Sequence, residues 1–500
     1  MKKTAVIPLS LLIVSSCCPP VKEKPPVYDL VEEWKAEAPM PTVAKSAPEN
    51  WWEVFQDETL NELVEEGLAS SPTFQAALTR LEEAIWLADS AWADQFPTLS
   101  AQASAVRRRI PKDFRTKGKV PTGKHSTPDP EKPDPHDPFP FIRCPAPLPP
   151  ATPKYKTVRS PKFFTDLLAN LLVNYEVDFW GKNWLTKEAA YRRAEASQAD
   201  VETTKLILVD QIASAYFSIQ SDTKEIEIVE EEIFILEERL SLVESEYKAG
   251  LIDEIPILDE KDILAERKIE KQALLRSKET NTNLLAILIG REPSQFTLDL
   301  SETNWIFPVV PAGIPSQLLS QRPDIRSIEK EVEALIAEIG IAKAELLPNL
   351  TLSAGAGHEA DKTNKLFKWR NRVWSLAGVF DWLLFDAGSR LAQIKAARSR
   401  FENAVANLTD QVLTSIRETE DALVAIRTQK ERQQLAQQRV EWFVQSTDLL
   451  VNQFESGLVD YQEVLTSKEV PLLARREVLK ESVNLQFATL ALIKSLGGSW

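Results

Sequence analysis

Two nearly identical glycine turns hold the residues of this sequence whose types and spacing suggest chemistry. The turns are FESGLVDYQEVL, which begins at Phe454, and YKAGLIDEIPIL, which begins at Tyr247. Asp253 and Asp460 each follow a glycine by three positions, and Glu463 lies beside the second turn. Such carboxylates, repeated in a ring around an opening, would attract cations and repel anions. The alternative is that charged helix ends only keep the protein soluble.

The rest of the sequence lacks the residue patterns of an enzyme. It has no phosphate-binding glycine loop, and its three histidines are His125, His136 and His358. The first two lie among aspartates in a proline-rich segment, but their spacing is not that of a known metal site. We therefore predict a protein that is not an enzyme and that needs no metal or diffusible cofactor.

The N-terminus has the pattern of a bacterial lipoprotein signal. Lys2 and Lys3 precede an apolar stretch that is too short to span a membrane, which needs about 20 apolar residues. The stretch ends in VSSC, which resembles a lipobox and predicts removal of residues 1–16 and a covalent lipid on Cys17. Because Cys18 stands where an aspartate would signal retention, the pattern favours the outer membrane. The alternative is an ordinary signal peptide followed by two incidental cysteines.

Composition narrows the class of protein further. The chain has 500 residues, of which 43% are hydrophobic and 27% charged, and its net charge is −15. Because nucleic acid binding needs a basic face, this balance argues against DNA or RNA as a partner. Residues 17–50 are rich in Pro, Lys and Glu and are expected to form a lipidated tether. Cys144 is the one cysteine beyond the N-terminus, so the chain has no disulfide framework.

Two very long helices are predicted to lead to the glycine turns, over residues 182–247 and 388–454, and each is followed by a return helix. Apolar residues recur at steps of three and four along the first, at Ile212, Ala215, Ile219, Ile226, Val229, Ile233, Leu236, Leu240, Val243 and Tyr247. Asp222 is the one break in this pattern, which otherwise predicts a coiled coil. At ~1.5 Å per residue, each helix would be a rod of roughly 100 Å.

This order of elements occurs twice in the chain. Tyr247, Gly250 and Gly290 correspond to Phe454, Gly457 and Gly497, each 207 positions later. We therefore predict two repeats, 51–300 and 301–500, with further helical segments near 51–92 and 321–346. The first repeat is longer because it contains an insert, residues 107–162.

The insert is proline-rich and basic. Residues 107–162 contain 14 of the 32 prolines, and 14 Lys and Arg against 5 Asp and Glu give a net charge of +9. Such a segment cannot build a core, so we expect an extended or mobile loop on the extracellular side. We also expect its charge to contact anionic lipopolysaccharide or a surface polymer.

Four segments alternate apolar and polar residues, which predicts strands with one apolar and one wet face. They are FPTLSAQASAV from Phe96, LLVNYEVDFW from Leu171, LPNLTLSAGAG from Leu347 and WSLAGVFDWLLF from Trp374. This alternation is typical of membrane β-barrel strands. Trp374, Phe380 and Trp382 share one side and suit a lipid face with aromatic residues near its borders.

Four strands cannot close a barrel, and lipid does not tolerate open sheet edges. The smallest membrane barrels need about eight strands, whereas three copies of this chain would supply twelve. The predicted fold is therefore mainly α with β: a trimeric 12-stranded membrane β-barrel, four strands per chain, continued by a long coiled-coil α-helical barrel. The alternative is a piece of soluble β-sandwich on a coiled-coil stalk.

Several ordered motifs resemble the TolC-type outer-membrane efflux proteins, specifically the OprM-like (NodT-type) lipoprotein branch. LLSQRPDIRSIEKEVEALIAEIGIAKAELLPNLTL looks like the signature region of that family, and WWEVFQDETLNELVEEGLASSPTFQAALTRLEEA resembles its N-terminal helices. YEVDFWGK and FDAGS resemble its two junctions between a strand and a rod helix. The similarity covers roughly residues 50–498 and is interrupted mainly by the insert.

This resemblance implies a homotrimer whose α-helical tunnel crosses the periplasm and closes at the glycine turns. The implied periplasmic gate comprises Asp460, Gln462, Glu463, Leu465 and Thr466. The implied docking tips for a periplasmic adaptor (membrane fusion) protein are Gly250, Leu251, Asp253, Gly457 and Leu458. Simple termination of helices by glycine is the alternative role of the two turns.

The sequence also departs from the family pattern at the gate. Thr466 stands where many members have an aspartate, and Phe454, Val459 and Pro256 replace the Tyr–Arg–Asp network that tethers the gate of TolC itself. We therefore expect a latch that depends more on packing than the latch of that relative does.

The function predicted from these features is a passive one. The chain would be the outer-membrane exit duct of a tripartite efflux system for small molecules such as drugs or toxic compounds, with its tunnel extending into the periplasm. An inner-membrane transporter, an indirect partner, would supply the energy, and outer-membrane lipids would surround the barrel. The alternatives are a channel for type I protein secretion and a structural lipoprotein that tethers envelope layers without conducting.

Overall fold

The computed structural model describes residues 50–109, 111, 117–121, 155–159, 163–300, 305–311 and 322–498, together with the single positions 23, 24, 26, 34 and 35. The predicted signal peptide, the lipidation site Cys17 and most of the tether lie outside the described residues. So do Cys144, His125, His136 and most of the insert.

The chain forms two compact units, one helical and one made of strands. The helical unit comprises Met1–Gln95, Asp178–Leu347 and Leu383–Trp500, and the sheet unit comprises Phe96–Val177 and Pro348–Trp382. Each unit therefore takes segments from both halves of the chain, so the compact units do not coincide with the two sequence repeats.

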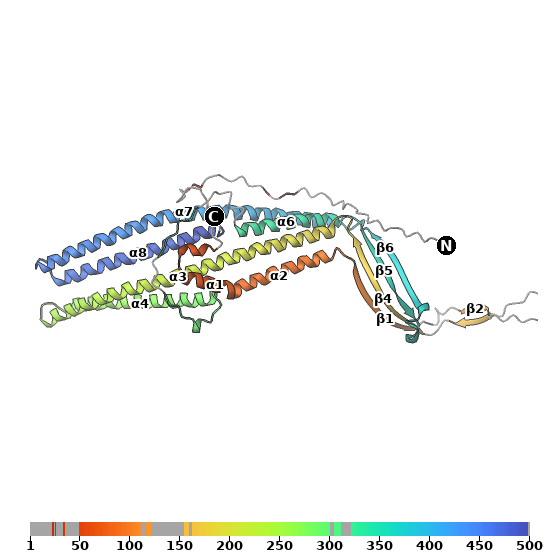
Figure 1. The fold of residues 1–500 in the computed structure, drawn as a ribbon, viewed down its shortest axis with the longest axis horizontal. Coiled ribbons are helices and arrows are strands. Elements are labelled where there is room, and N and C mark those ends of the chain that lie inside the picture. The colour runs from red at the N-terminus through yellow and green to blue at the C-terminus, as the bar shows by residue number, and fades with distance from the viewer. Residues whose placement is uncertain are drawn as a thin grey trace, which may run out of the picture. The chain divides into compact units, whose positions relative to one another are not determined.

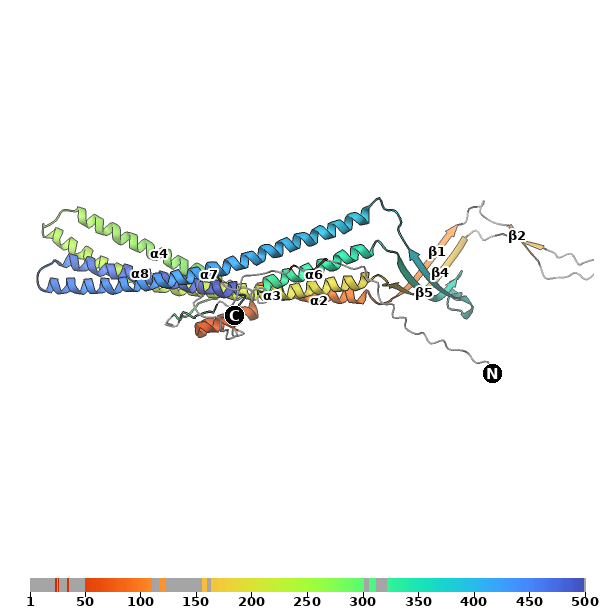
Figure 2. The same ribbon diagram turned by 90° about the horizontal axis from the view of Figure 1, so that it is seen from above.

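Two helical hairpins dominate the helical unit (Figure 1). The rods α3 (Lys182–Lys248) and α7 (Ser389–Glu455) each contain 67 residues. Both lie within one residue of the ranges predicted for the two long helices. The return helix α4 (Ile255–Leu288) packs along α3, and α8 (Tyr461–Ser495) packs along α7. Helix α8 also lies against α3, which joins the two hairpins to each other (Figure 2).

Shorter helices complete the helical unit. The segment expected to be helical over 51–92 forms η1 (Trp51–Phe55), α1 (Glu58–Ser70) and α2 (Pro72–Ala93). Helix α1 ends before Pro72, because proline disfavours helical backbone at the residue before it and has no N–H to donate. Helix α6 (Pro323–Ala344) packs on α3 and α7, and η3 (Pro293–Gln295) follows α4. No helix among the described residues is both long and apolar enough to cross a membrane.

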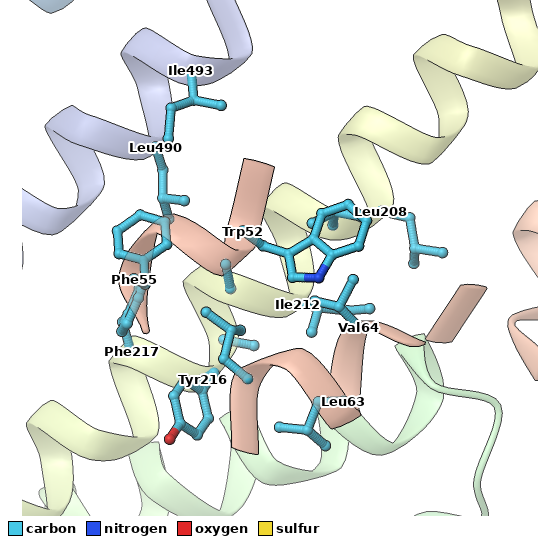
Figure 3. Close-up of a cluster of buried hydrophobic side chains, with 14 of the residues drawn as sticks. Trp52, Phe55, Leu63, Val64, Leu208, Ile212, Tyr216, Phe217, Leu490 and Ile493 are labelled. Carbon is cyan, nitrogen blue, oxygen red and sulfur yellow. The ribbon is translucent and has the colours of Figure 1, made fainter. Parts of the chain in front are cut away.

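The main core of the helical unit lies where these short helices meet the rods (Figure 3). Trp52 and Phe55 of η1 and Val64 of α1 pack against Ile212 and Phe217 of α3, and all five are at most 3% exposed. Leu490 and Ile493 bring α8 into the same cluster. Ile212, Ala215 and Ile219, three of the predicted heptad residues, are therefore buried in this core, whereas Tyr247 near the end of α3 is 45% exposed.

One buried polar group organises this core. Asp57 accepts hydrogen bonds from the Leu60 N–H at 3.1 Å, where it caps α1, and from the Tyr216 hydroxyl at 2.8 Å. Gln220 donates to the same hydroxyl at 2.8 Å, and Trp305 donates to Gln220 at 2.6 Å. This chain of bonds satisfies polar groups that would otherwise be costly to bury.

The sheet unit contains a four-stranded antiparallel sheet in the order β1-β4-β5-β6. The strands are β1 (Thr98–Arg109), β4 (Phe163–Val177), β5 (Asn349–Ala360) and β6 (Arg372–Asp381). The turns η5 (Thr363–Lys365) and η6 (Trp369–Asn371) lie between β5 and β6. The four predicted strands are thus all present, although β4 begins eight residues before the predicted start at Leu171.

The register of the sheet separates an apolar face from a polar face. Leu99, Val173, Ala354 and Leu376 stand opposite one another in one cross-strand row. The neighbouring row, on the other face, consists of Thr98, Asn174, Ser353 and Ala377. On that face the Ser353 hydroxyl donates to the Asn174 side chain at 2.8 Å. The alternation expected from the sequence is therefore confirmed across all four strands.

The insert has more regular structure than its composition predicts. The segments β2 (Lys117–Pro121) and β3 (Tyr155–Arg159) pair antiparallel, with Lys117 opposite Arg159. The expectation of an extended or mobile loop is therefore wrong at these ten positions, and also at residues 107–109, which belong to β1. Each of the two segments contains a valine, and β3 adds a tyrosine and a threonine, residue types that favour strands even among many prolines.

Both glycine turns have the same backbone geometry. The Gly250 N–H donates to the Tyr247 carbonyl at 2.9 Å, and the Leu251 N–H donates to the Glu246 carbonyl at 3.0 Å. The equivalent bonds form at Gly457, and the two glycines have φ of 74° and 72°. These pairs of bonds close a helix C-terminus around a left-handed residue. The duplicated motif therefore encodes a duplicated helix stop.

Glycine is required more strictly at position 290 than at these tips. Gly290 has φ of 78°, and a Cβ atom there would overlap the backbone oxygen of Ser70, whereas a Cβ at Gly250 would meet nothing within 4 Å. We predict that Gly250→Ala lowers the free energy of unfolding by about 1–2 kcal/mol, the cost of the left-handed conformation alone. Gly290→Ala should cost clearly more. Thermal unfolding of the two purified variants, followed by circular dichroism, compares them; equal losses would contradict the contact with Ser70.

Candidate functional site

The second glycine turn is followed at once by the start of α8. Asp460 is the N-cap of this helix, and its Oδ1 atom accepts from the Glu463 N–H at 2.8 Å. An aspartate here satisfies an N–H that has no helical partner and interacts favourably with the helix dipole. At the first turn, Asp253 accepts from the Ile255 N–H at 3.2 Å. Both acids therefore have a structural role in addition to their charge.

A groove lies between α7 and α8 directly behind the second turn. Its volume is about 540 Å³, and its α7 wall is formed by Phe443, Ser446, Thr447 and Leu450. Its α8 wall is formed by Asp460, Gln462, Glu463, Thr466, Ser467 and Val470. The Thr447 hydroxyl donates to the Ser467 carbonyl at 2.9 Å and ties the two walls together. The structure thus brings four of the five predicted gate residues into one groove.

Leu465, the fifth predicted gate residue, does not share this surface. Its side chain is fully buried within the chain, at 0% exposure. Its neighbours Glu463 and Thr466 are exposed, because helical periodicity turns Leu465 toward the interior of the helical unit. Leu465 therefore packs between helices, and the candidate gate surface consists of the other four residues.

The five predicted docking residues all lie at exposed positions. Gly250 and Gly457 end the two rods, and each is followed by a leucine. Leu251 and Leu458 are each 75% exposed, although leucine normally favours burial. Asp253 is exposed as well, despite its hydrogen bond to the backbone. Each tip therefore presents one apolar side chain beside one acidic side chain.

A buried cluster of charged side chains joins α3, α4 and α8 behind the tips. The members of this three-helix ion cluster are Glu225, Glu232 and Arg239 on α3, Glu260, Arg267 and Glu270 on α4, and Glu469 and Arg476 on α8. Five carboxylates therefore share three guanidinium groups. Because α8 belongs to the second repeat, these ion pairs connect the two repeats.

Glu232 lies at the centre of the cluster, with 0% of its side chain exposed. Arg267 approaches it to 3.3 Å and Arg476 to 3.6 Å. Arg476 also binds Glu225 at 2.8 Å and forms an ion pair with Glu270. A carboxylate buried this completely depends on such cations, since leaving its charge unpaired would be strongly destabilising.

In the half of the ion cluster nearer the tips, one arginine again bridges carboxylates of two other helices. Arg239, with 7% of its side chain exposed, binds Glu260 of α4 at 2.7 Å and Glu469 of α8 at 3.0 Å. Next to the groove, the Tyr461 hydroxyl donates to Glu238 of α3 at 2.5 Å. The start of α8 is therefore held on α3 by both a hydrogen bond and a bridging arginine.

The three-helix ion cluster shifts the pKa values of two of its carboxyls in opposite directions. Burial raises the pKa of the Glu232 carboxyl above its ordinary value, against the opposing effect of Arg476 and Arg267. Burial also acts on Glu270, but its hydrogen bond and ion pair with Arg476 outweigh burial and lower the pKa of that carboxyl. The hydrogen bond to Glu238 raises the pKa of Tyr461. Burial therefore disfavours the charged form of Glu232.

The expectation that the latch depends more on packing than the latch of TolC stays a prediction. Sequence reasoning missed the three-helix ion cluster, whose residues lie away from Phe454, Val459 and Pro256. A signal was present: Glu225, Glu232 and Arg239 are spaced by seven residues beside the apolar heptad positions, as are the pairs Glu260 and Arg267, and Glu469 and Arg476. Charges at heptad spacing on three helices lie on one face of each helix and can meet there.

Other candidate sites gain no support within the described residues. In that part of the chain, no group of three or more His, Cys, Asp or Glu side chains is arranged to hold a metal ion. His358 lies on β5, where its ring is 5.8 Å from the ring of Phe367.

Comparison with known proteins decides the family. The family model for outer membrane efflux proteins matches residues 160–291 and 314–498, which together are more than half of the chain. The chain belongs to this family. The resemblance to TolC-type efflux channels seen in the sequence motifs is therefore confirmed, and so is the prediction that the protein is not an enzyme.

Curated relatives of this outer membrane efflux protein match along most of their length. The solvent efflux pump outer membrane protein SrpC of Pseudomonas putida is 24% identical over 452 residues, which cover 90% of this chain and 87% of the relative. The pyoverdine export outer membrane protein OpmQ of Pseudomonas aeruginosa is 27% identical over 457 residues, with the same coverage of 90% and 87%.

Solved structures share the fold. The CmeC outer membrane channel of Campylobacter jejuni aligns with a TM-score of 0.80 at 20% identity and covers 97% of this chain and 95% of its own. The outer membrane protein VceC of Vibrio cholerae aligns with a TM-score of 0.72 at 25% identity, with coverage of 90% and 99%. The predicted combination of long helices with a strand portion is thus found in related chains.

The raised pKa of Glu232 predicts a stability difference that depends on pH. Between the ordinary value of 4.5 and the raised pKa, the folded protein holds a proton that the unfolded chain has lost, so the wild-type protein loses stability as pH rises through this window. Glu232→Gln removes that loss. We expect its unfolding temperature to match the wild type near pH 4.5 and to exceed it at pH 7.5.

Arg476→Gln is the matched opposite change, because it removes a cation and leaves the acids. It should lower the free energy of unfolding by about 3–5 kcal/mol at pH 7.5. Thermal unfolding of both variants across this pH range, at one protein concentration, makes the comparison. If Glu232→Gln were as destabilising as Arg476→Gln at pH 7.5, the assignment of Glu232 as the unfavourable charge would be refuted.

Proposed function

We propose that this outer membrane efflux protein is the exit duct of a tripartite efflux system that exports small molecules. The observation that carries the proposal is the four-stranded sheet with one apolar face, one polar face and two open edges. Within the described residues, β1 and β6 each pair on one side only. Because open edges are not tolerated in lipid, such a sheet needs strands from other copies to become a membrane barrel.

Three copies of the chain would make this barrel. They would supply twelve strands, a number compatible with an aqueous lumen and with closed rotational symmetry. In that arrangement the apolar face, which carries the exposed Leu99, Leu376 and Trp374, would meet lipid. The polar face, with Asn174 and Ser353, would line the lumen.

An unpartnered apolar stripe on α7 supports association of the helical units. Leu413, Val424, Leu435, Trp442 and Leu449 are between 41% and 64% exposed. Their spacings of eleven, eleven, seven and seven residues keep them on one face of the helix, since each step is close to a whole number of turns. We propose that this stripe packs against a neighbouring copy in the helical barrel.

The groove behind the second turn is the proposed periplasmic gate. Asp460 and Glu463 would each occur three times around the opening, where they would favour cations over anions. The three-helix ion cluster would hold α8, and with it the groove, onto the first repeat. The exposed Leu251 and Leu458 would be the apolar contacts offered to the periplasmic adaptor protein, and an inner-membrane transporter would supply energy through that adaptor.

The membrane anchor and the cargo complete the proposal. We propose that Cys17 carries a covalent lipid, which would fix residues 17–50 at the outer membrane. The two relatives described above are named for solvent efflux and pyoverdine export, which are small-molecule cargoes. We propose cargo of that size, and small cargo distinguishes this function from type I protein secretion.

Reconstitution in planar bilayers tests the duct and its gate together. We predict that the wild-type protein conducts with a preference for cations and that Asp460→Asn with Glu463→Gln abolishes most of this preference. Asparagine caps helices as well as aspartate does, so the double variant removes charge without removing the start of α8. The measurement is the reversal potential in a salt gradient.

Asp448→Asn is the control, because it removes a carboxylate from an exposed position of α7 outside the groove. It should leave the ion preference unchanged. A protein that stays silent at all voltages, in both the wild-type and the double-variant form, would contradict the duct and favour a structural tether.

The α7 stripe gives a test of assembly. Leu435→Glu with Trp442→Glu should weaken self-association by about tenfold or more, because two large apolar side chains lose their burial. Gln437→Glu, which adds a charge on the opposite side of the same helix, should have little effect. Sedimentation of the detergent-solubilised protein gives the mass of each species; trimers of unchanged stability in the double variant would exclude the stripe from the interface.

A further inference from the structure

A second hollow lies on the apolar face of the sheet, well apart in sequence from the gate. It is a groove of about 990 Å³ that crosses all four strands. Two neighbouring cross-strand rows of the apolar face form its floor: Ala101, Leu171, Ala356 and Trp374 in one, and Ala103, Ala169, His358 and Arg372 in the other. We name it the sheet groove.

The floor of the sheet groove is formed mostly by small side chains. Four of its eight positions are alanines, which leave space that larger side chains would fill. Trp369 and Trp374, which also line the groove, are 76% and 81% exposed. The four alanines of the floor, together with the large rings of Trp369 and Trp374, make a slot suited to an alkyl chain.

The same groove carries positive charge, although its two arginines also line a neighbouring hollow that contains Asp166, Glu359 and Asp361. Arg370 and Arg372 line it, and no aspartate or glutamate does so among the described residues. Neither arginine forms an ion pair with a described residue. Arg372 is nevertheless held in place, because its Nε donates to the Trp369 carbonyl at 3.0 Å and its guanidinium lies 3.2 Å from the centre of the Trp369 ring.

A further polar atom in the groove lacks a partner. The Nδ1 atom of His358 is buried and makes no hydrogen bond within the described part of the chain. His358 stands directly opposite Arg372 in the strand register. The accessible charge of the groove therefore comes from the exposed guanidinium groups of Arg370 and Arg372, while the Nδ1 atom of His358 lies below the surface.

This combination fits an amphiphile with an anionic phosphate group. Arginine binds phosphate through paired N–H donors, and alkyl chains gain free energy when they cover apolar surface. On a face that meets lipid, as the proposed function requires, unpaired arginines would be costly and would recruit an anion. Arg372 begins β6, and tryptophans near strand ends typically mark the border of a bilayer, where lipid phosphates lie.

We propose that the sheet groove is a binding site for one phosphate-bearing, negatively charged lipid. The phosphate contacts Arg370 and Arg372, and one acyl chain lies over Ala101, Ala103 and Ala356. The inference rests on the proposed placement of the apolar face in the membrane, and it adds a specific lipid to that placement. The lipid would cover the sheet at the end where the strands meet the 361–371 connection.

The test is lipid retention by the full-length protein, measured by native mass spectrometry in detergent. Phosphatidylglycerol is the anionic probe, and phosphatidylcholine, which carries a phosphate but no net charge, is the neutral probe. We expect the wild-type protein to retain phosphatidylglycerol at least about tenfold more tightly than phosphatidylcholine. Inorganic phosphate should not displace the lipid, because it lacks the acyl chain; displacement by phosphate alone would overturn the proposal of a lipid site.

Two independent variants separate the headgroup from the chain. Arg370→Gln with Arg372→Gln removes the charge, and Ala356→Leu fills the slot without changing the charge. Each should lower the affinity for phosphatidylglycerol by about tenfold or more. Arg108→Gln is the matched control, because Arg108 lies on the opposite face of the same sheet, beside Phe164. It should bind as the wild type does.

The remaining outcomes contradict either the lipid site or the duct. Equal retention of the two lipids, or unchanged binding in the double arginine variant and in Ala356→Leu, overturns the lipid site. Bilayer conductance of the same variants separates this failure from failure of the duct. Normal conductance without lipid selectivity refutes the sheet groove alone. A protein that never conducts, either as the wild type or with Asp460→Asn and Glu463→Gln, refutes the proposed function on which the groove depends.

Discussion

The burial of one carboxylate, Glu232, constrains the whole region around the helix tips. A charge with no exposed surface must find cations, and two of them come from different helices: Arg267 from α4 and Arg476 from α8. Those arginines then bind Glu225 and Glu270, so one buried charge specifies how three helices meet. Apolar heptad packing alone would tolerate a helix that slides along its neighbour, whereas paired charges at fixed heights along the helices do not.

The acids at the glycine turns combine two functions that sequence alone cannot separate. Asp460 caps α8 and also lines the groove, so its carboxylate is both a structural acceptor and a fixed negative charge. Glu463 donates its backbone N–H to that cap while its side chain lies in the same groove. The proposed gate therefore includes the residue that caps the start of α8. A change of charge at this place would alter the proposed opening without moving α8 only where the cap is preserved.

Most of the fold could be predicted from the periodicity of apolar residues, because residues that are buried at regular spacing form a visible pattern in the sequence. The rods, the return helices, the repeated turn and the alternating strands were all predictable from apolar spacing and from glycine. What periodicity could not show was which residues face one another. Leu465 lies among exposed gate residues in sequence yet is buried, and the partners of Arg476 are more than 200 positions away. The hairpin β2–β3 was hidden by the prolines around it. Local composition says little about a contact whose two halves are distant in the chain.

The equal length of α3 and α7 has a consequence for how such a protein can change over time. Each rod has 67 residues, and each is matched by a return helix of 34 or 35 residues. An insertion in one rod alone would displace its tip by about 1.5 Å per residue and rotate everything beyond it by about 100° per residue. Only insertions close to whole heptads keep the buried face, and they must occur in both hairpins together to keep the tips level. The four helices are therefore matched in length as a set, and a lone insertion or deletion in any one of them would move one tip out of line with the other.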